Sequence, residues 1–376
     1  YANVHISNRR IGLGKVLIQD SHTKMAFLTG YFSHNLFKDV QANLSVTSDQ
    51  FEVMNLSSYD NNIFYGNVIA SMDSLTLKGP FNNLKLSVYN IAPAAKSRIF
   101  IPVSSSSGTG SYSYVSFKNY GKTQDRLVKK HKDKFSISID ANLNTLAEMV
   151  IVLDQANGDE IRAKGDGRIQ MEIPPNNDLS INGVYTIDNG TYTFTFNQLF
   201  IRRSFSLDPG STISFNGPFA QTSLSVDATY RAKAKLSDLL TEADKTYSSS
   251  DLTDAQTPQW VDVSLRMFGL LSKPTLTFDL DLEDKHSQNT VGYSKLRQLN
   301  SDPRQQFTQV GSLLLVGQFV PPDGIGSGVA ISGAVNNVSQ ILSSTASSGL
   351  TAIINKLTGD KDLNIAVKYT NYNYTD

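Results

Sequence analysis

Four carboxylates near residue 280 are the side chains whose types and spacing come closest to a reactive site. They are Asp279, Asp281, Glu283 and Asp284. Carboxylate oxygens suit Ca²⁺, but the oxygen-rich loop with Gly that such a site commonly uses is missing from the sequence. The first three also alternate with Leu280 and Leu282, which places them on the polar face of a strand. We therefore interpret them as a solvated face and expect no metal site.

The other candidates for chemistry are dispersed. The five histidines are His5, His22, His34, His131 and His286. No two of them have metal-ligand spacing. The glycine-rich run 324–328 follows Pro321 and Pro322 instead of the strand that a phosphate-binding loop needs. Nucleophile-elbow, kinase and His-Glu-x-x-His motifs are absent from the sequence. We expect no catalytic residue and no cofactor, and we predict that the chain is not an enzyme.

The charge balance and the cysteine count exclude further classes. The sequence has 34 Lys plus Arg and 34 Asp plus Glu, so its net charge is zero and we expect no nucleic-acid partner. The absence of cysteine excludes a disulfide framework and a Cys-based metal site. Charged residues make up only 18%, which is typical of an extracellular or envelope β protein. The chain begins at Tyr1 without Met, and we interpret it as a fragment with any membrane anchor upstream.

The elements that must position any functional residue are strands. From Ile169 to Glu283 apolar and polar residues alternate with a period of two, so the sheet has one apolar and one polar face. The pattern leaves three ways to cover the apolar face: a sandwich, a closed barrel, or a sheet curled into an open trough. The residues that we predict to line the apolar face are Ile169, Met171, Ile173, Tyr192, Phe194, Phe196, Ile213, Phe215, Leu224, Val226, Tyr230, Val263, Leu265, Leu276, Phe278, Leu280 and Leu282.

A short internal repeat also favours a sheet that grows by repetition. The segment 75–81 (LTLKGPF) is echoed by 213–219 (ISFNGPF), and an alternating strand follows each copy. The Gly-Pro pair ends a strand, because Pro cannot donate a hydrogen bond within a ladder. The repeat therefore predicts a meander built from one strand–turn–strand unit.

The pattern changes after about residue 290. Asp302 followed by Pro303 predicts the start of a helix. The segment 324–355 has no charged residue and apolar positions at helical spacing, and Leu363, Ile365 and Val367 predict a final strand. We predict four segments: a repetitive β-sheet at 1–160, a β-trough at 161–295, a charge-poor helical segment at 296–358 and a C-terminal strand at 359–376.

The sequence resembles the C-terminal domain of the TamB family. The resemblance rests on a Gly-x-Tyr-x-aromatic strand at 190–194, an aromatic-x-Gly-Pro strand end at 215–218 and an Ala-x-Tyr strand at 228–230. Pro218 directly follows Gly217, a small departure from the Gly-x-Pro of the family. The match is good over residues 160–282, whereas residues 1–160 agree only in their general strand-like pattern. The segment 305–319 resembles versions found in Bacteroidota-like bacteria.

The resemblance implies a fold, a location and partners. The fold would be a mainly β, elongated sheet curled into an apolar-lined trough, followed by one or two helices and a final strand. The protein would be anchored in the inner membrane of a Gram-negative bacterium and cross the periplasm. It would work with a TamA-like or BamA-like outer-membrane barrel of the Omp85 type. Its cargo would be phospholipid, whose acyl chains would lie on the predicted apolar face, without a cofactor or an active site.

Two other functions remain open at this point. The exposed strand edges of such a sheet could guide nascent outer-membrane proteins by strand addition, as a periplasmic chaperone or assembly factor would. A cell-surface β-sandwich that binds carbohydrate would need exposed aromatic residues, and Trp260 near a strand start is the one Trp. No pair of carboxylates stands apart from the polar face, which disfavours a glycosidase.

Overall fold

The computed structural model describes residues 4–61, 63–103, 134–155, 157–175, 179–196, 201–241, 244, 246, 248–284 and 289–320. The chain divides into two compact units. Unit 1 comprises residues 1–190, 209–225 and 269–274, and unit 2 comprises residues 191–208, 226–268 and 275–376. The predicted boundaries at 160 and 295 fall inside a strand and a helix, and the division into four segments stays a prediction. The predicted helix and strand beyond residue 320 lie outside the described residues.

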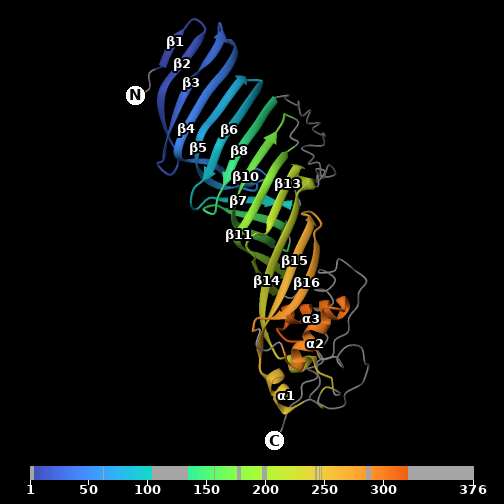
Figure 1. Cartoon of the computed structure of the whole chain (residues 1–376). Helices are drawn as coiled ribbons and strands as arrows, with labels where there is room; N and C mark the ends of the chain where they lie inside the picture. Colours follow the sequence, from blue (N-terminus) through green and yellow to red (C-terminus); the bar gives the residue numbers. More distant parts are fainter. Residues whose placement is uncertain are drawn as a thin grey trace, which may run out of the picture. The chain divides into compact units, whose positions relative to one another are not determined.

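Unit 1 begins with an antiparallel meander, in which each strand pairs with the next (Figure 1). Val, Ile, Leu and Phe alternate with polar residues along these strands, as a half-buried sheet requires. The strands are β1 (Val4–Ser7), β2 (Arg10–Gln19), β3 (Met25–Asn35), β4 (Lys38–Leu56), β5 (Tyr65–Pro80) and β6 (Asn83–Pro93).

The next strands of unit 1 add two parallel pairs. They are β7 (Arg98–Pro102), β8 (Lys134–Leu143), β9 (Glu148–Asp154) and β10 (Asp159–Ile173). Strand β6 pairs in parallel with β8, and β7 pairs in parallel with β9. Val88 lies opposite Ile139, fifty-one residues away, and a shift of register then places Ile91 opposite Ala141, fifty residues away. Arg98 lies opposite Glu148, also fifty residues away, so the offset is the same on both sides of the turn. The β6–turn–β7 segment and the β8–turn–β9 segment are therefore two stacked copies of one bent rung.

The bends fold the sheet of unit 1 into two walls. The beginning of β5 pairs with β7 while its later part pairs with β6, and the beginning of β10 pairs with β9 while its later part pairs with β8. We call the sheet of β6, β8 and the later parts of β5 and β10 the first wall, and the sheet of β7, β9 and the beginnings of β5 and β10 the second wall. The mainly β fold with a curled sheet followed by helices is thereby confirmed.

Ser97 holds the corner between the two walls. Its Oγ donates a hydrogen bond to the Ile69 carbonyl (2.9 Å) and accepts one from the Ile69 N–H (3.1 Å). The Ala94 N–H reaches the same carbonyl at 2.7 Å. Ser97 is buried, and a buried backbone group without a partner would be costly. The corner is thus stable because its backbone groups are paired.

Two glycines allow close contact between β10 and the neighbouring strand β11 (Ser180–Phe196). A Cβ atom at Gly167 would overlap the carbonyl of Val184, and one at Gly183 would overlap the carbonyl of Arg168. Gly183 also has a φ of +133°, which side chains of other residues disfavour. Both positions therefore require glycine for the backbones to approach.

Strands β12 to β16 complete the sheet. Strand β13 (Thr212–Pro218) pairs with the beginning of β11 in unit 1, and β12 (Ile201–Leu207) pairs with the end of β11 in unit 2. Strand β14 (Ser223–Ala234) begins in unit 1 and continues into unit 2. Strands β15 (Gln259–Leu270) and β16 (Thr275–Leu282) form an antiparallel pair. The predicted strand ends at the two Gly-Pro pairs are confirmed, because β5 ends at Pro80 and β13 at Pro218.

Helices accompany the strands of unit 2. They are α1 (Ser249–Gln256), α2 (Val291–Leu299), α3 (Pro303–Leu315) and the 3₁₀ helix η4 (Leu236–Leu239), and another 3₁₀ helix, η3 (Phe219–Gln221), lies in unit 1. The predicted start of α3 is confirmed, since the Asp302 carboxylate accepts a hydrogen bond from the Arg304 N–H at 3.0 Å. Among the described residues, no helix combines the length and the apolar character that a membrane span requires.

A buried glutamine fixes the chain after α3. The Gln309 side chain donates to the Val320 carbonyl and accepts from the Val320 N–H, both at 2.8 Å. Ser312 Oγ donates to the Gln318 carbonyl at 2.7 Å. Arg203 donates to the Leu314 carbonyl at 2.7 Å, one of the carbonyls that a helix end leaves unpaired. Side chains therefore supply hydrogen-bond partners for the backbone of this segment, which belongs to no strand.

Candidate apolar groove

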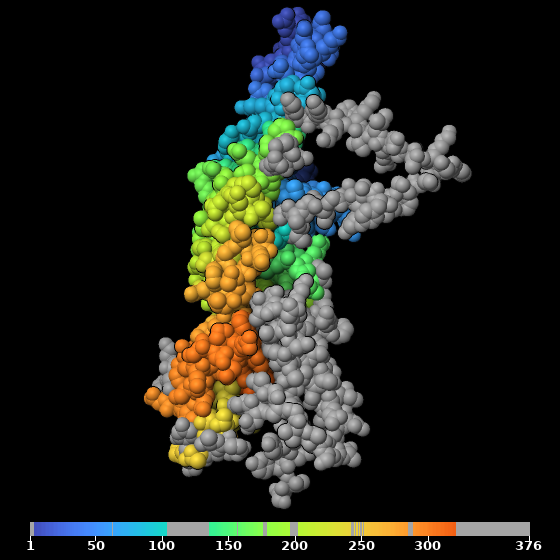
Figure 2. All heavy atoms as spheres, turned by 90° about the vertical axis from the view of Figure 1, so that its right-hand side faces the viewer, coloured from blue at the N-terminus to red at the C-terminus, as the bar shows by residue number. Residues whose placement is uncertain are grey.

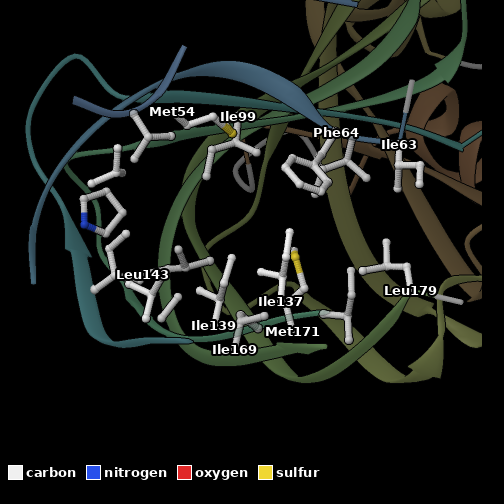
Figure 3. Close-up of a pocket in the computed structure, with 18 of the residues that line it drawn as sticks. Met54, Ile63, Phe64, Ile99, Ile137, Ile139, Leu143, Ile169, Met171 and Leu179 are labelled. Atoms are coloured by element: carbon white, nitrogen blue, oxygen red, sulfur yellow. The ribbon is translucent and has the colours of Figure 1, made fainter. Parts of the chain in front are cut away.

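A groove of about 350 Å³ lies between the two walls of unit 1. The first wall contributes Leu86, Val88, Ile137, Ile139, Ile169 and Met171, and the second wall contributes Val68, Ile99, Ile101 and Met149. The end of β4 and the turn after it add Met54, Ile63 and Phe64. Figure 3 shows Met54, Ile63, Phe64 and Ile99 on one side of an open space and Ile137, Ile139, Ile169, Met171 and Leu179 on the other.

The alternation along each strand explains why the groove is apolar. In β8, Ile137, Ile139 and Ala141 line the groove, so the residues between them point to the other face of the sheet. Asp140 is one of these, and it forms a bidentate ion pair with Arg168 of β10 at 2.8 and 2.9 Å. The Arg168 hydrogen bond lowers the pKa of the Asp140 carboxyl below its ordinary value. The charges thus lie outside the groove.

The second wall shows the same division. Arg98 of β7 pairs with Glu148 of β9 at 2.5 Å, and Arg162 of β10 pairs with Glu160 at 2.7 Å. The hydrogen bond to Glu160 raises the pKa of the Arg162 guanidinium. These strands nevertheless present Ile99, Ile101 and Met149 to the groove. Each rung therefore has an apolar inner side and ion pairs on its outer side.

The chemistry of the lining determines what the groove can hold. Every side chain that lines it is apolar, so a polar ligand or water would find no side-chain hydrogen bond there. Its volume is many times the ~10–15 Å³ that holds one water molecule. Aliphatic chains gain about 0.8 kcal/mol for each CH₂ that leaves water. The groove is therefore suited to a hydrocarbon chain.

The comparison with protein families now decides the assignment. The family model for the TamB C-terminal domain matches residues 18–376. The chain belongs to the TamB family. The predicted membership is confirmed, and the match extends far upstream of residues 160–282, where the resemblance was clearest. Neither the curated proteins nor the solved structures gave a match to this chain.

The TamB family is involved in outer-membrane assembly or lipid transport. It works with an Omp85-type partner in assembly. Membership of the family therefore implies a role in the bacterial envelope.

Six of the residues predicted to line the apolar face lie in unit 1 of the TamB domain. Ile169, Met171 and Phe215 line the groove. Ile213 and Leu224 are buried in the same unit, and Ile173 is partly exposed at the end of β10. The structure therefore brings only part of the predicted set to the groove.

The predicted residues in unit 2 form a covered core. Phe278 meets Phe307 of α3 edge to face, with ring centroids 5.9 Å apart, and both α2 and α3 contact β16. Tyr230 and Leu276 are partly exposed, and the side chain of Phe196 lies outside the described residues. The buried members of this set are Tyr192, Phe194, Val226, Val263, Leu265, Phe278, Leu280 and Leu282. Their role as a lipid-facing lining stays a prediction.

Most of the groove was missed from the sequence. Leu86, Val88, Ile137 and Ile139 belong to the region 1–160, where the sequence predicted strands but no lining residues. The signal was present, because each of these residues alternates with Ser or Lys. What the alternation does not show is which stretches of an apolar face a helix covers. Strands β6 and β8 line open space, whereas β16 contacts two helices.

The carboxylates near residue 280 are explained by ion pairs. Asp279 pairs with Arg297 of α2 at 3.0 Å, and Glu283 pairs with Arg231 of β14 at 2.6 Å. Arg231 also reaches Asp262 at 2.8 Å. Within the part of the chain that the structure describes, no cluster of His, Asp or Glu could hold a metal ion.

Asp208 of unit 2 lies close to two other carboxylates. Burial raises the pKa of Asp208 above its ordinary value, and the nearby charges of Asp227 and Asp262 raise it further. Arg266 pairs with Asp227 at 2.7 Å. The surroundings of Asp208 thus disfavour its charged form, although a hydrogen bond from Thr229 partly offsets this effect.

Proposed function

We propose that this TamB domain carries phospholipid toward the outer membrane by holding acyl chains in the apolar groove of unit 1. The observation that supports this most directly is the lining, in which no side chain can form a hydrogen bond. A trough with two walls also keeps one side open, so a lipid headgroup could stay in water while its acyl chains are buried.

The proposal includes a location and a partner. The protein would be held at the inner membrane, reach across the periplasm of a Gram-negative bacterium and meet a TamA-like or BamA-like barrel of the Omp85 type. Family membership supports these points. The protein would act without catalysis, because moving a lipid along an apolar surface breaks no bond.

A charge placed in the groove tests the proposal. Met171 lines the groove, whereas Gln170 is its exposed neighbour on the same strand. The chain would be produced in the periplasm of a bacterial host, and the phospholipid that copurifies would be measured by mass spectrometry. We expect Met171→Arg to lose most of the bound phospholipid, because a charge in an apolar groove is poorly solvated. Gln170→Arg is the matched control and should retain it.

Equal amounts of phospholipid in the two variants would refute the lipid-binding role. Circular dichroism and urea unfolding would show that both variants fold. A photo-reactive residue at Ile139, which also lines the groove, separates this function from a chaperone role. Lipid adducts support the conduit, whereas polypeptide adducts would support an assembly factor that binds nascent outer-membrane proteins.

A further inference from the structure

Three hairpin turns of unit 1 lie along one edge of its sheet. They are the β1–β2 turn at 8–9, the β3–β4 turn at 36–37 and the β5–β6 turn at 81–82. The register aligns them, because Arg10 pairs with Ser33 next to the first two turns and Gln41 pairs with Pro80 next to the second and third. We call this edge the tip edge. Figure 2 shows the surface of these N-terminal strands in blue.

The tip edge exposes large apolar side chains. Leu36 is 81% exposed, Phe37 74% and Phe81 57%. Single exposed apolar residues are ordinary on protein surfaces. Here, however, they occupy successive turns of one edge, where they extend beyond the strands that carry them. The apolar residues are therefore arranged as separate protrusions and not as a flat face.

Cations flank these apolar residues. Arg9 is exposed in the first turn, and Lys38 is exposed next to the second. Lys78 and Lys85 are exposed and lie opposite each other in the register of the β5–β6 hairpin. Asp39 is the acidic residue beside the second turn. The edge is thus locally positive, although the whole chain has a net charge of zero.

The second turn holds bulky residues at backbone angles that disfavour them. Leu36 has a φ of 49° and Phe37 a φ of 62°, and both lie between the paired residues Asn35 and Lys38. Two-residue turns with positive φ at both positions strongly prefer Asn-Gly, because bulky side chains are disfavoured there. The protein therefore keeps two bulky apolar residues at a strained and solvent-exposed position.

A buried histidine beneath the turn adds a second cost. The His34 ring stacks on Phe37 with centroids 4.5 Å apart, and its Nδ1 accepts a hydrogen bond from the Phe37 N–H. His34 is only 7% exposed, and its Nε2 is buried without a partner. Buried polar atoms are normally paired. The turn therefore combines positive φ angles with an unpaired buried atom, and the ring stack and the hydrogen bond offset only part of these costs.

We propose that the tip edge inserts into the surface of a lipid bilayer that carries anionic headgroups. A few apolar side chains with flanking Lys and Arg suffice for such binding, because the apolar groups enter the acyl boundary while the cations meet the headgroups. A stable protein partner would instead need about 1,000 Å² or more of total buried surface, which separate protrusions do not offer. The apolar groove plays no part in this contact.

The test replaces the strained apolar turn with the turn that its geometry prefers. The double variant Leu36→Asn/Phe37→Gly removes both apolar side chains and supplies the Asn-Gly pair. We expect it to bind phosphatidylglycerol–phosphatidylethanolamine vesicles at least about tenfold more weakly than the wild type in flotation assays. Its apparent Tm should rise by roughly 2–4 °C, because the positive φ angles no longer carry bulky residues.

Two controls separate insertion of the tip edge from general surface apolarity and from lipid carriage in the groove. Leu146 is 54% exposed in the turn between β8 and β9, so Leu146→Asn removes an exposed apolar residue away from the tip edge and should leave flotation unchanged. Met171→Arg in the groove should also leave flotation unchanged, although under the proposed function it removes lipid from the groove. A lower Tm in the double variant, its undiminished flotation, or the absence of flotation by the wild type would overturn the proposal.

Discussion

Partial filling of the groove gives a quantitative test of its contents. Ala141 lines the groove and is partly exposed, so the larger side chain of Ala141→Leu has space to enter it. Leucine carries three more carbon atoms than alanine and displaces about three methylene groups of a bound chain. At ~0.8 kcal/mol per CH₂, the loss is about 2.4 kcal/mol, or ~60-fold in Kd. The fold itself should lose little stability, because the new side chain occupies empty volume.

The assay is a titration with fatty acids of increasing chain length. The wild-type protein should gain about 0.8 kcal/mol for each added CH₂ until the groove is full. Ala141→Leu should weaken the binding of the longest chains by the amount given above. The control is Gln170→Leu, since Gln170 lies on the exposed face of the adjacent strand β10. Acyl chains do not occupy the groove if Ala141→Leu binds long chains as tightly as the wild type, or if Gln170→Leu weakens binding equally.

Two further predictions concern unit 2. Gln309→Leu removes the side-chain partner of both backbone groups of Val320. The free energy of unfolding, measured by urea titration, should therefore fall by about 2–6 kcal/mol. An unchanged free energy of unfolding would show that this side chain does not fix the segment after α3. The pKa of Asp208 is higher in the folded state than its ordinary value, so the wild type loses stability as the pH rises through the folded-state pKa. Asp208→Asn carries no ionisable group there and should be more stable than the wild type near neutral pH. This gain should vanish below the ordinary aspartate pKa of 3.8, and a gain that does not depend on pH would contradict the assignment.

Much of the strand content could be predicted from the sequence, because alternation is a local property. Ile137 and Ile139 alternate with Ser138 and Asp140, and the structure places the first two on the inner face. The start of α3 was likewise predictable from Asp302 and Pro303, since a capping side chain acts on the neighbouring turn. Local chemistry therefore accounts for the elements.

The partners of the strands could not be predicted in this way. Strand β6 pairs with β8 across about fifty residues of chain, and alternation carries no information on which strand lies next to which. The corner at Ser97 depends on Ile69, a residue of a different strand. The sequence therefore predicts an apolar face, whereas the two walls depend on tertiary contacts.

The same limit applies to the candidate site. Phe215 and Phe278 each stand between two polar residues in the sequence, yet Phe215 lines the groove while Phe278 packs against Phe307. Packing of α3 makes this difference, and it depends on residues some thirty positions away. The turn at Leu36 and Phe37 also escaped prediction, because these residues are not turn formers.

The stacked rungs have a consequence for movement. Strands β6 and β8 place apolar residues opposite one another, as at Leu86 and Ile137 and at Val88 and Ile139, so a hydrocarbon chain that shifts by one rung exchanges one set of methyl and methylene contacts for a similar set. Its energy landscape along the stack is nearly level, as on a one-dimensional track. A level track permits diffusion in both directions and favours neither. Any net flux must therefore be imposed at the ends of the track, by the supply of lipid at one side and its removal at the other.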